Sequence, residues 1–282
     1  MAFLSKSRPI IRSAGLTAAA SVPAAALDMT EKASTKIGDC EGYAEMIRYH
    51  APSQSLFVTA SETGTLERIS MANPSALGLA TPFDLDGGNV TAVAVHGDLV
   101  AASIKADAAD APGEVKLYDT NGTLLASYPT GALPDNVAFS PDGRFMLTAN
   151  EGEPSDDYSV DPEGSFTLID LANGPASAVV TQISLDGFSA PAGSRIVKPG
   201  SSFAADAEPE YVAFAPDGKL AYVTLQENNA VAVIDIASAS VAAVSGLGTK
   251  NVSRTSHDMS NKDSGINMKR WPVLMMYQPD AI

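Results

Sequence analysis

Short runs of alternating hydrophobic residues, separated by turn motifs, fill most of the chain. Residues 134–144 (PDNVAFSPDGR) are nearly repeated at residues 209–219 (PEYVAFAPDGK), with the same offset of 75 residues at every position. Each copy predicts a strand, a Pro-Asp-Gly turn and a second strand, because proline fixes φ at the turn and glycine supplies a positive φ. The strands expected after the turns are residues 145–149 and 166–171 in the first copy, and 220–225 and 230–236 in the second.

Weaker copies of this pattern lie upstream. The strands expected there are residues 44–49, 56–59 and 65–70, and then 90–95, 99–104, 114–119 and 124–128. Matching positions fall near Met46, Val90, Val137 and Val212, at spacings of 44, 47 and 75 residues. A period of ~40–50 residues with four short strands per repeat is typical of propeller blades. The sequence therefore predicts an all-β fold, a β-propeller of four-stranded antiparallel blades with four blades and a partial fifth over residues 44–282. A β-sandwich with accidental similarity is the alternative, and the eleven-residue match disfavours it.

The longest spacing indicates an insertion, divided between residues 151–164 and residues 186–207. The first part, EGEPSDDYSVDPEG, is strongly acidic. Its six carboxylates are Glu151, Glu153, Asp156, Asp157, Asp161 and Glu163. Carboxylates this close repel one another unless a cation or water screens them, and calcium takes 6–8 oxygen ligands. The spacing does not match an EF-hand, so a calcium site and a solvated acidic loop both stay open.

Composition excludes several classes of partner and chemistry. The chain of 282 residues carries 18 Lys and Arg against 33 Asp and Glu, a net charge of −15. Phosphate backbones and anionic lipid need a basic face, so neither nucleic acid nor an anionic membrane is expected as a partner. The single cysteine, Cys40, excludes an internal disulfide framework and a zinc site built on several thiolates.

The first 26 residues resemble a targeting segment. Lys6, Arg8 and Arg12 precede a short apolar run, and Ala24, Ala25 and Ala26 offer the small residues that signal peptidase needs. We expect a signal peptide at residues 1–26, a linker at 27–43, and an exported protein of the periplasm, the extracellular space or the cell surface. No run approaches the ~20 apolar residues of a transmembrane helix.

Known catalytic motifs are absent from the sequence. The three histidines are His50, His96 and His257, and the first two fall at turns between predicted strands. No GxSxG elbow, HExxH motif, P-loop or GxGxxG motif occurs. A catalytic residue set therefore cannot be named.

Three segments carry a family resemblance: residues 133–164, 208–235 and 265–282, the last reading GINMKRWPVLMMYQPDAI. They are similar to the choice-of-anchor I domain family, which includes bacterial exported proteins and animal proteins labelled mesenchyme-specific cell surface glycoprotein. More distantly, the pattern resembles YncE-like and WD40-like propellers. The resemblance implies a seven-bladed propeller, on an exported or surface-attached protein. Some family members are labelled alkaline phosphatase-like or are fused to phosphoesterase domains.

The family domain continues beyond the segment that matches residues 278–282. We therefore expect this chain to be truncated within a blade, with a closed smaller propeller or assembly from two chains as alternatives. An open propeller would expose strand edges and an apolar face, which favours self-association or pairing with the blades that the chain lacks.

The sequence supports two hypotheses about function. The first is a non-catalytic binding module for a protein, glycan or surface ligand. Its candidate contacts on the loop face are Gln226, Glu227, Asn228, Asn229, His257, Asp258 and Asn267. Loops at one end of a propeller form good recognition surfaces. The second is a metal-dependent phosphoesterase, or a domain that assists one, with its metals in the acidic insertion.

Overall fold

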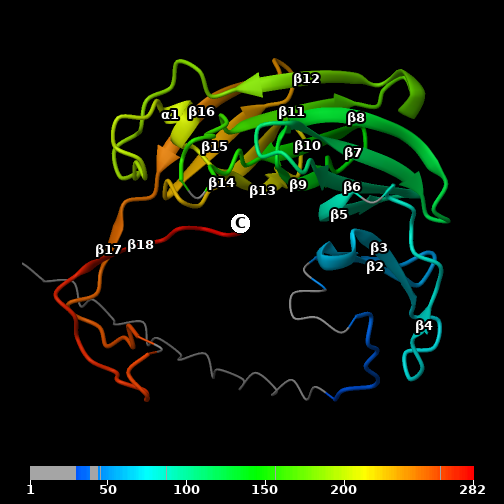
Figure 1. Cartoon of the computed structure of the whole chain (residues 1–282), viewed down its shortest axis with the longest axis horizontal. Helices are drawn as coiled ribbons and strands as arrows, with labels where there is room; N and C mark the ends of the chain where they lie inside the picture. The colour runs from blue at the N-terminus through cyan, green and yellow to red at the C-terminus, as the bar shows by residue number, and fades with distance from the viewer. Residues whose placement is uncertain (1–29, 39–43, 45, 87, 156, 261) are drawn as a thin grey trace, which may run out of the picture. The chain divides into compact units, whose positions relative to one another are not determined.

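Four antiparallel sheets of four strands make up most of the structure, a computed structural model that describes residues 30–38, 44, 46–86, 88–155, 157–260 and 262–282. We name them sheets A to D in chain order (Figure 1). The predicted signal peptide and, within the predicted linker, residues 27–29 and 39–43 with Cys40 lie outside the described residues. The two compact units of the chain divide after Lys32, and the following account concerns the second, Ala33–Ile282.

Each sheet is a meander in which consecutive strands pair. Sheet A consists of β1 (Ile47–His50), β2 (Ser55–Ala60), β3 (Thr65–Ser70) and β4 (Gly78–Leu79). Sheet B consists of β5 (Asn89–His96), β6 (Leu99–Lys105), β7 (Pro112–Asp119) and β8 (Leu124–Ala132). A 3₁₀ turn, η1 (Ser61–Thr63), joins β2 to β3.

The two sheets built on the near-identical repeat have the same plan. Sheet C consists of β9 (Pro134–Phe139), β10 (Phe145–Asn150), β11 (Ser165–Asp170) and β12 (Val179–Ser184), with η2 (Pro175–Ser177) before β12. Sheet D consists of β13 (Pro209–Phe214), β14 (Leu220–Leu225), β15 (Ala230–Asp235) and β16 (Ser240–Gly246). A hairpin of β17 (Thr249–Asn251) and β18 (Leu274–Met276) follows.

The predicted strands are confirmed, with small differences at their ends. The first begins at Ile47 and not at residue 44, and β8 runs on to Ala132. The fourth strands of sheets A, C and D, β4, β12 and β16, carry weak patterns because they are largely exposed, and the sequence did not identify them. Among the described residues the only α-helix is the four-residue α1 (Phe203–Asp206), which confirms the expected low helix content.

The core lies between consecutive sheets. The first strands β1, β5, β9 and β13 contact one another in that order, so neighbouring sheets meet along them. Three clusters of buried side chains fill the spaces. The first cluster contains Phe57 of sheet A and Val93 of sheet B, the second Leu117 of sheet B and Met146 of sheet C, and the third Leu147 of sheet C and Ile234 of sheet D. Both faces of a sheet need such cover, because inner strands such as β6 and β10 have buried apolar residues on both sides.

The second part of the insertion belongs to the core between sheets C and D. Phe203 and Ala204 of α1 are buried in that core, and Ser202 caps the helix by accepting a hydrogen bond from the Ala205 amide at 3.1 Å. The insertion therefore packs beside the acidic loop that precedes β11, and the Gly164 amide donates to Ala204 O at 3.0 Å.

Candidate functional site

The meander places two kinds of connection at opposite ends of the sheets. At one end, which we call the turn end, lie the tight turns after β1, β5, β9 and β13, including both Pro-Asp-Gly turns. His50 and His96 close β1 and β5 at this end, where the sequence placed them. At the other end, the loop end, lie the starts of β5, β9 and β13 and the long loops between second and third strands.

Acidic side chains from three separate segments meet at the loop end of sheets C and D. They act on one another electrostatically, and we call them the carboxylate cluster: Asp135, Glu151, Glu153, Glu208 and Glu210. Two of them were predicted in the acidic loop. The other three come from the starts of β9 and β13, and the sequence analysis missed them as site residues. The sequence feature that could have indicated them is the acidic residue after proline in both repeat copies, Asp135 and Glu210.

Bulges in the first strands position two members of this cluster. In β9 the register shifts so that Asp135 has no partner across β10, and in β13 the pairing passes from Pro209 directly to Val212. A bulge re-aims the side chain that it carries and twists the strand locally. Asp135 and Glu210 thus leave the regular ladder at equivalent places on neighbouring sheets.

Hydrogen bonds of the preceding residue and of its own backbone amide hold Glu151 in place. The preceding Asn150 is fully buried and donates to Ser165 Oγ at 3.2 Å and Thr167 Oγ1 at 3.0 Å. The Glu151 amide donates to Leu133 O at 2.8 Å. The first residue of the acidic loop is therefore fixed by the sheet, although the loop itself is irregular.

The cluster raises the pKa of three carboxyl groups. Burial, together with the charges of Asp135 and Glu153, raises the pKa of Glu151 to about 9. Burial and neighbouring carboxylates likewise raise the pKa of Glu208 to about 7 and that of Glu210 to about 8. Desolvation and like charge both disfavour the ionised form, so these groups hold protons that carboxyl groups in water would release.

The five predicted carboxylates of the acidic loop that the structure describes do not converge on one point. Asp161 pairs with Lys198 at 2.6 Å. Asp157 accepts hydrogen bonds from the Ser159 amide at 3.0 Å and Ser155 Oγ at 2.9 Å, and bonds from these two serines lower its pKa to about 2. Glu163 is exposed, and Asp156 lies outside the described residues. Within the part of the chain that the structure describes, no three acidic, histidine or cysteine side chains are placed to hold a metal ion.

The predicted contact segment 226–229 divides into a half-buried part, Gln226 and Glu227, and a fully buried part, Asn228 and Asn229. In the amide orientation that satisfies both groups, Gln226 donates to Glu210 Oε1 at 2.6 Å, and Glu227 lies 3.4 Å from Arg195 Nη1. Asn228 is fully buried, and its amide donates to Asp206 O and Oδ2, each at 2.8 Å. Asn229 is also fully buried. Gln226 and Glu227 thus border the carboxylate cluster, whereas the two asparagines hold loops together, so we expect no direct ligand contact from them.

The remaining predicted contacts lie in the segment between β17 and β18. His257 Nε2 is 2.8 Å from Thr255 Oγ1, and Asp258 accepts a hydrogen bond from the Asn267 amide at 3.2 Å. These three predicted residues are close to one another. No contact that we observe links them to the carboxylate cluster.

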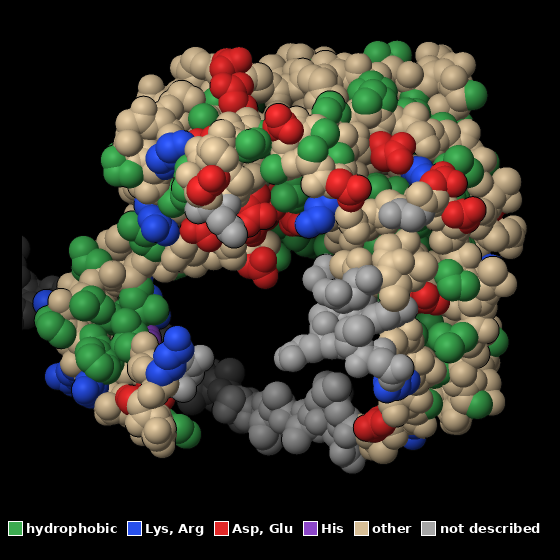
Figure 2. All heavy atoms as spheres, viewed as in Figure 1, with side chains coloured by type: hydrophobic (Ala, Val, Ile, Leu, Met, Phe, Trp, Pro, Cys, Tyr) green, Lys and Arg blue, Asp and Glu red, His purple; other side chains and the backbone are tan. Residues whose placement is uncertain are grey.

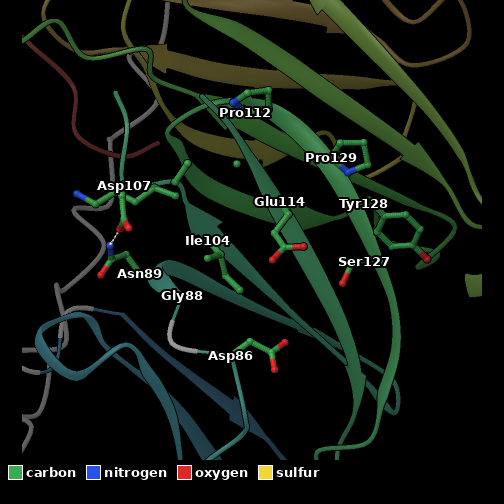
Figure 3. Close-up of a pocket in the computed structure, with 13 residues that line it drawn as sticks. Asp86, Gly88, Asn89, Ile104, Asp107, Pro112, Glu114, Ser127, Tyr128 and Pro129 are labelled. Atoms are coloured by element: carbon green, nitrogen blue, oxygen red, sulfur yellow. Dashed lines mark hydrogen bonds between the residues drawn. The ribbon is translucent and has the colours of Figure 1, made fainter. Parts of the chain in front are cut away.

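Two cavities open at the loop end. One of 530 Å³ is lined by Asp135, Glu151 and Glu153 together with Lys105 and Asn89, so it adjoins the cluster. The other, of 590 Å³, lies on sheet B, where Asp86 and Glu114 are among its lining side chains and Asn89 donates to Asp107 at 3.1 Å (Figure 3).

A lysine neutralises the acidic side chains that line the second cavity. The nearly buried Lys116 ammonium lies 2.6 Å from Asp86 Oδ2 and 3.7 Å from Glu114 Oε1. Asp86 and Glu114 are thus paired with a cation within the protein, whereas burial and neighbouring carboxylates raise the pKa of Glu151, Glu208 and Glu210 in the carboxylate cluster. The first cavity is the better candidate for a ligand.

Four meander sheets, each packed on the next through its first strand, define a β-propeller. The sequence matches the Choice-of-anchor I domain over residues 45–282, and the chain belongs to this family. No curated protein matches the chain. Among the described residues, no helix has the length and hydrophobicity that crossing a bilayer requires.

Solved structures share the fold at low identity. The chain is similar to the Cps50 (Swd1) β-propeller domain of Myceliophteria thermophila, with 12% identity, 74% of this chain and 57% of that chain covered, and a TM-score of 0.52. It is also similar to hydrazine synthase of Kuenenia stuttgartiensis, with 15% identity, 67% and 52% covered, and a TM-score of 0.50. A chain of the mitotic checkpoint complex gives 10% identity, 74% and 53% covered, and a TM-score of 0.50. The chain therefore spans a little over half the length of these structures.

Proposed function

We propose that this protein is an exported, surface-associated β-propeller that binds a protein, glycan or other surface ligand and catalyses no reaction. The membership of the Choice-of-anchor I family and the propeller fold support a surface module. The basic start of the chain and its small-residue segment support export. The ligand would bind at the loop end, where loops from several sheets come together.

The carboxylate cluster is the observation that carries the proposal. The pKa values of Glu151, Glu208 and Glu210 are raised to about 9, 7 and 8, so near neutral pH Glu151 and Glu210 hold protons and Glu208 is about half protonated. A divalent cation such as calcium would replace those protons and relieve the repulsion, since calcium prefers carboxylate oxygens. The side chains would have to draw closer together around the ion, because as they stand no three of the described ones form a ready site.

Thermal unfolding at increasing calcium concentrations tests whether the carboxylate cluster binds the cation. At a calcium concentration about 100 times Kd, binding stabilises a folded protein by about 2.7 kcal/mol, which for a chain of this size raises Tm by about 5–10 °C. We expect this rise in the wild-type protein and its loss in Glu151→Gln and Glu210→Gln. Asp98→Asn, which removes an exposed carboxylate at the turn end, is the matched control and should keep the full response. A melt that stays unchanged up to millimolar calcium contradicts the cation site.

A phosphatase assay tests the absence of catalysis. Hydrolysis of p-nitrophenyl phosphate should stay at background in the presence of calcium or zinc. Turnover that depends on Asp156 or Asp157, measured with Asp156→Ala and Asp157→Ala, would show a phosphoesterase and overturn the binding-module proposal.

A further inference from the structure

An arm of residues 248–277 leaves sheet D, and one buried side chain holds both of its ends. The Asn229 amide nitrogen donates to Gly248 O at 2.8 Å, and its oxygen accepts hydrogen bonds from the Tyr277 and Gln278 amides at 2.8 and 3.0 Å. The Leu247 amide donates to Asn229 O at 2.9 Å. Asn229 is fully buried, so the base of the arm is a fixed part of the propeller.

Strand pairing and side-chain contacts hold several points of the described part of the arm, residues 248–260 and 262–277. Strands β17 and β18 pair over three residues each, and His257 and Lys269 form a further bridge. Trp271 Nε1 donates to His257 O at 2.8 Å, and the Lys269 ammonium lies 4.1 Å from the centre of the Trp271 ring. A pre-ordered element loses little conformational entropy on docking, which favours its use as a contact surface.

The outer surface of the arm is unusually apolar. Seven of the 17 large hydrophobic side chains that are exposed among the described residues belong to the arm. On β18, Leu274 is 63% exposed and Met276 is 41% exposed. They pair with Asn251 and Thr249 of β17 and are two residues apart, so both side chains lie on the same face of the hairpin. Contiguous exposed apolar surface marks interaction sites, and methionine adapts readily to a partner.

The arm is also basic, in contrast to the rest of the chain. Its cations are Lys250, Arg254, Lys262, Lys269 and Arg270, and its acids are Asp258 and Asp263. The arm thus has a net charge of +3, which leaves −18 for the remainder of a chain of −15. Figure 2 shows hydrophobic and basic side chains gathered at the β17–β18 hairpin, whereas acidic side chains are spread over the sheets.

We propose that this arm docks on the acidic body of a second copy of the same chain. The charges are complementary, and opposite potentials steer partners together and fix their orientation. The apolar face of β18 would supply the buried area of the contact. Because arm and acceptor are different surfaces, the contact is heterologous and builds closed rings or open chains of copies. An anionic bilayer is disfavoured as the occupant, because it would repel the body of −18.

Sedimentation of the full-length protein at micromolar concentrations tests the self-association. We expect oligomers whose association constant falls as salt is raised, since salt screens exposed charges. Arg270→Glu should weaken association about fivefold or more, as expected for a residue that contributes at an interface. Lys219→Glu, which reverses an exposed charge in the Pro-Asp-Gly turn of sheet D, is its matched control and should have little effect.

Two further pairs of variants test the apolar face and the acceptor. Leu274→Ser with Met276→Ser should abolish association, whereas Leu79→Ser, at a side chain 55% exposed on β4, should not. On the acceptor side, Glu153→Lys at the loop end should weaken association more than Asp98→Lys at the turn end. Circular dichroism of each variant separates a lost contact from a lost fold.

Three outcomes overturn the proposal. A monomer at every concentration and salt excludes self-docking. If Arg270→Glu and Lys219→Glu change the association constant equally, the contact lies elsewhere on the molecule. Binding of the monomer to phosphatidylserine vesicles, lost in Leu274→Ser with Met276→Ser, would identify a membrane as the occupant. These measurements are made in chelator-treated buffer, so a failure of the self-association is distinguishable from a failure of the calcium site.

Discussion

Glu151 and Asp157 show how differently two carboxylates of one loop can behave. Both belong to the acidic segment that the sequence singled out as a group of six equivalent residues. Asp157 is exposed and stabilised as an anion by two serines, while Glu151 is half-buried beside other carboxylates. The segment composition was visible in the sequence, but the environment of each residue depends on which strands and loops come to lie beside it.

The raised pKa of Glu151 predicts a loss of stability with rising pH. The folded state holds its proton up to about pH 9, whereas the unfolded chain releases it near the ordinary value of 4.5. The folded protein therefore binds more protons between these values, so the free energy of unfolding falls as pH increases through this window. In chelator-treated buffer at pH 8, we expect Glu151→Gln to stabilise the protein by about 1–2 kcal/mol.

Thermal unfolding from pH 4 to pH 9 checks this effect. The two proteins should melt alike near pH 4 and separate above it, with the wild type melting lower. Glu163→Gln removes an exposed carboxylate from the same loop and serves as the control. A wild-type Tm that rises relative to that of Glu151→Gln between pH 5 and pH 8 contradicts the assigned environment.

At the level of elements, the two Pro-Asp-Gly turns were predicted correctly because their chemistry is local. Gly143 and Gly218 adopt φ values of +72° and +69°, as the sequence required. Their surroundings differ in a way that the near-identical sequences conceal. A Cβ on Gly143 would collide with the His96 ring of the neighbouring sheet, whereas one on Gly218 would come no closer than 3.7 Å to Pro141.

This pair predicts two alanine substitutions of unequal cost. Gly218→Ala should lose about 1–2 kcal/mol from the left-handed backbone alone. Gly143→Ala should lose about 1–3 kcal/mol more, because the extra methyl overpacks the junction between sheets B and C. Chemical denaturation measures both, and His96→Ala should restore part of the loss in Gly143→Ala only. Equal costs for the two glycines would contradict the close approach of the sheets.

At the scale of the whole molecule, stability is divided among three interfaces between successive sheets. Phe57 belongs to the core between sheets A and B, and Leu147 to the core between sheets C and D; both are fully buried. Stacked repeats contact mainly their neighbours, so a local defect affects the adjacent sheets first.

Truncation of these two side chains should have regional effects. Phe57→Ala and Leu147→Ala should each cost about 2–5 kcal/mol, from lost burial and the cavity left behind. Hydrogen exchange followed by mass spectrometry should show faster exchange in sheets A and B for the first, and in sheets C and D for the second. A uniform increase across all four sheets would show that the propeller unfolds as one cooperative unit.

The sequence alone determined the strands, the turns and the repeat, because alternation and turn chemistry act between residues a few positions apart. It therefore identified the propeller class and the acidic insertion. Only the tertiary structure decided that Asp135, Glu208 and Glu210 join Glu151, that Asn228 and Asn229 are buried, and that β18 presents Leu274 and Met276 on one face. These features bring together residues far apart in the chain, and burial and electrostatics depend on such neighbours rather than on local order.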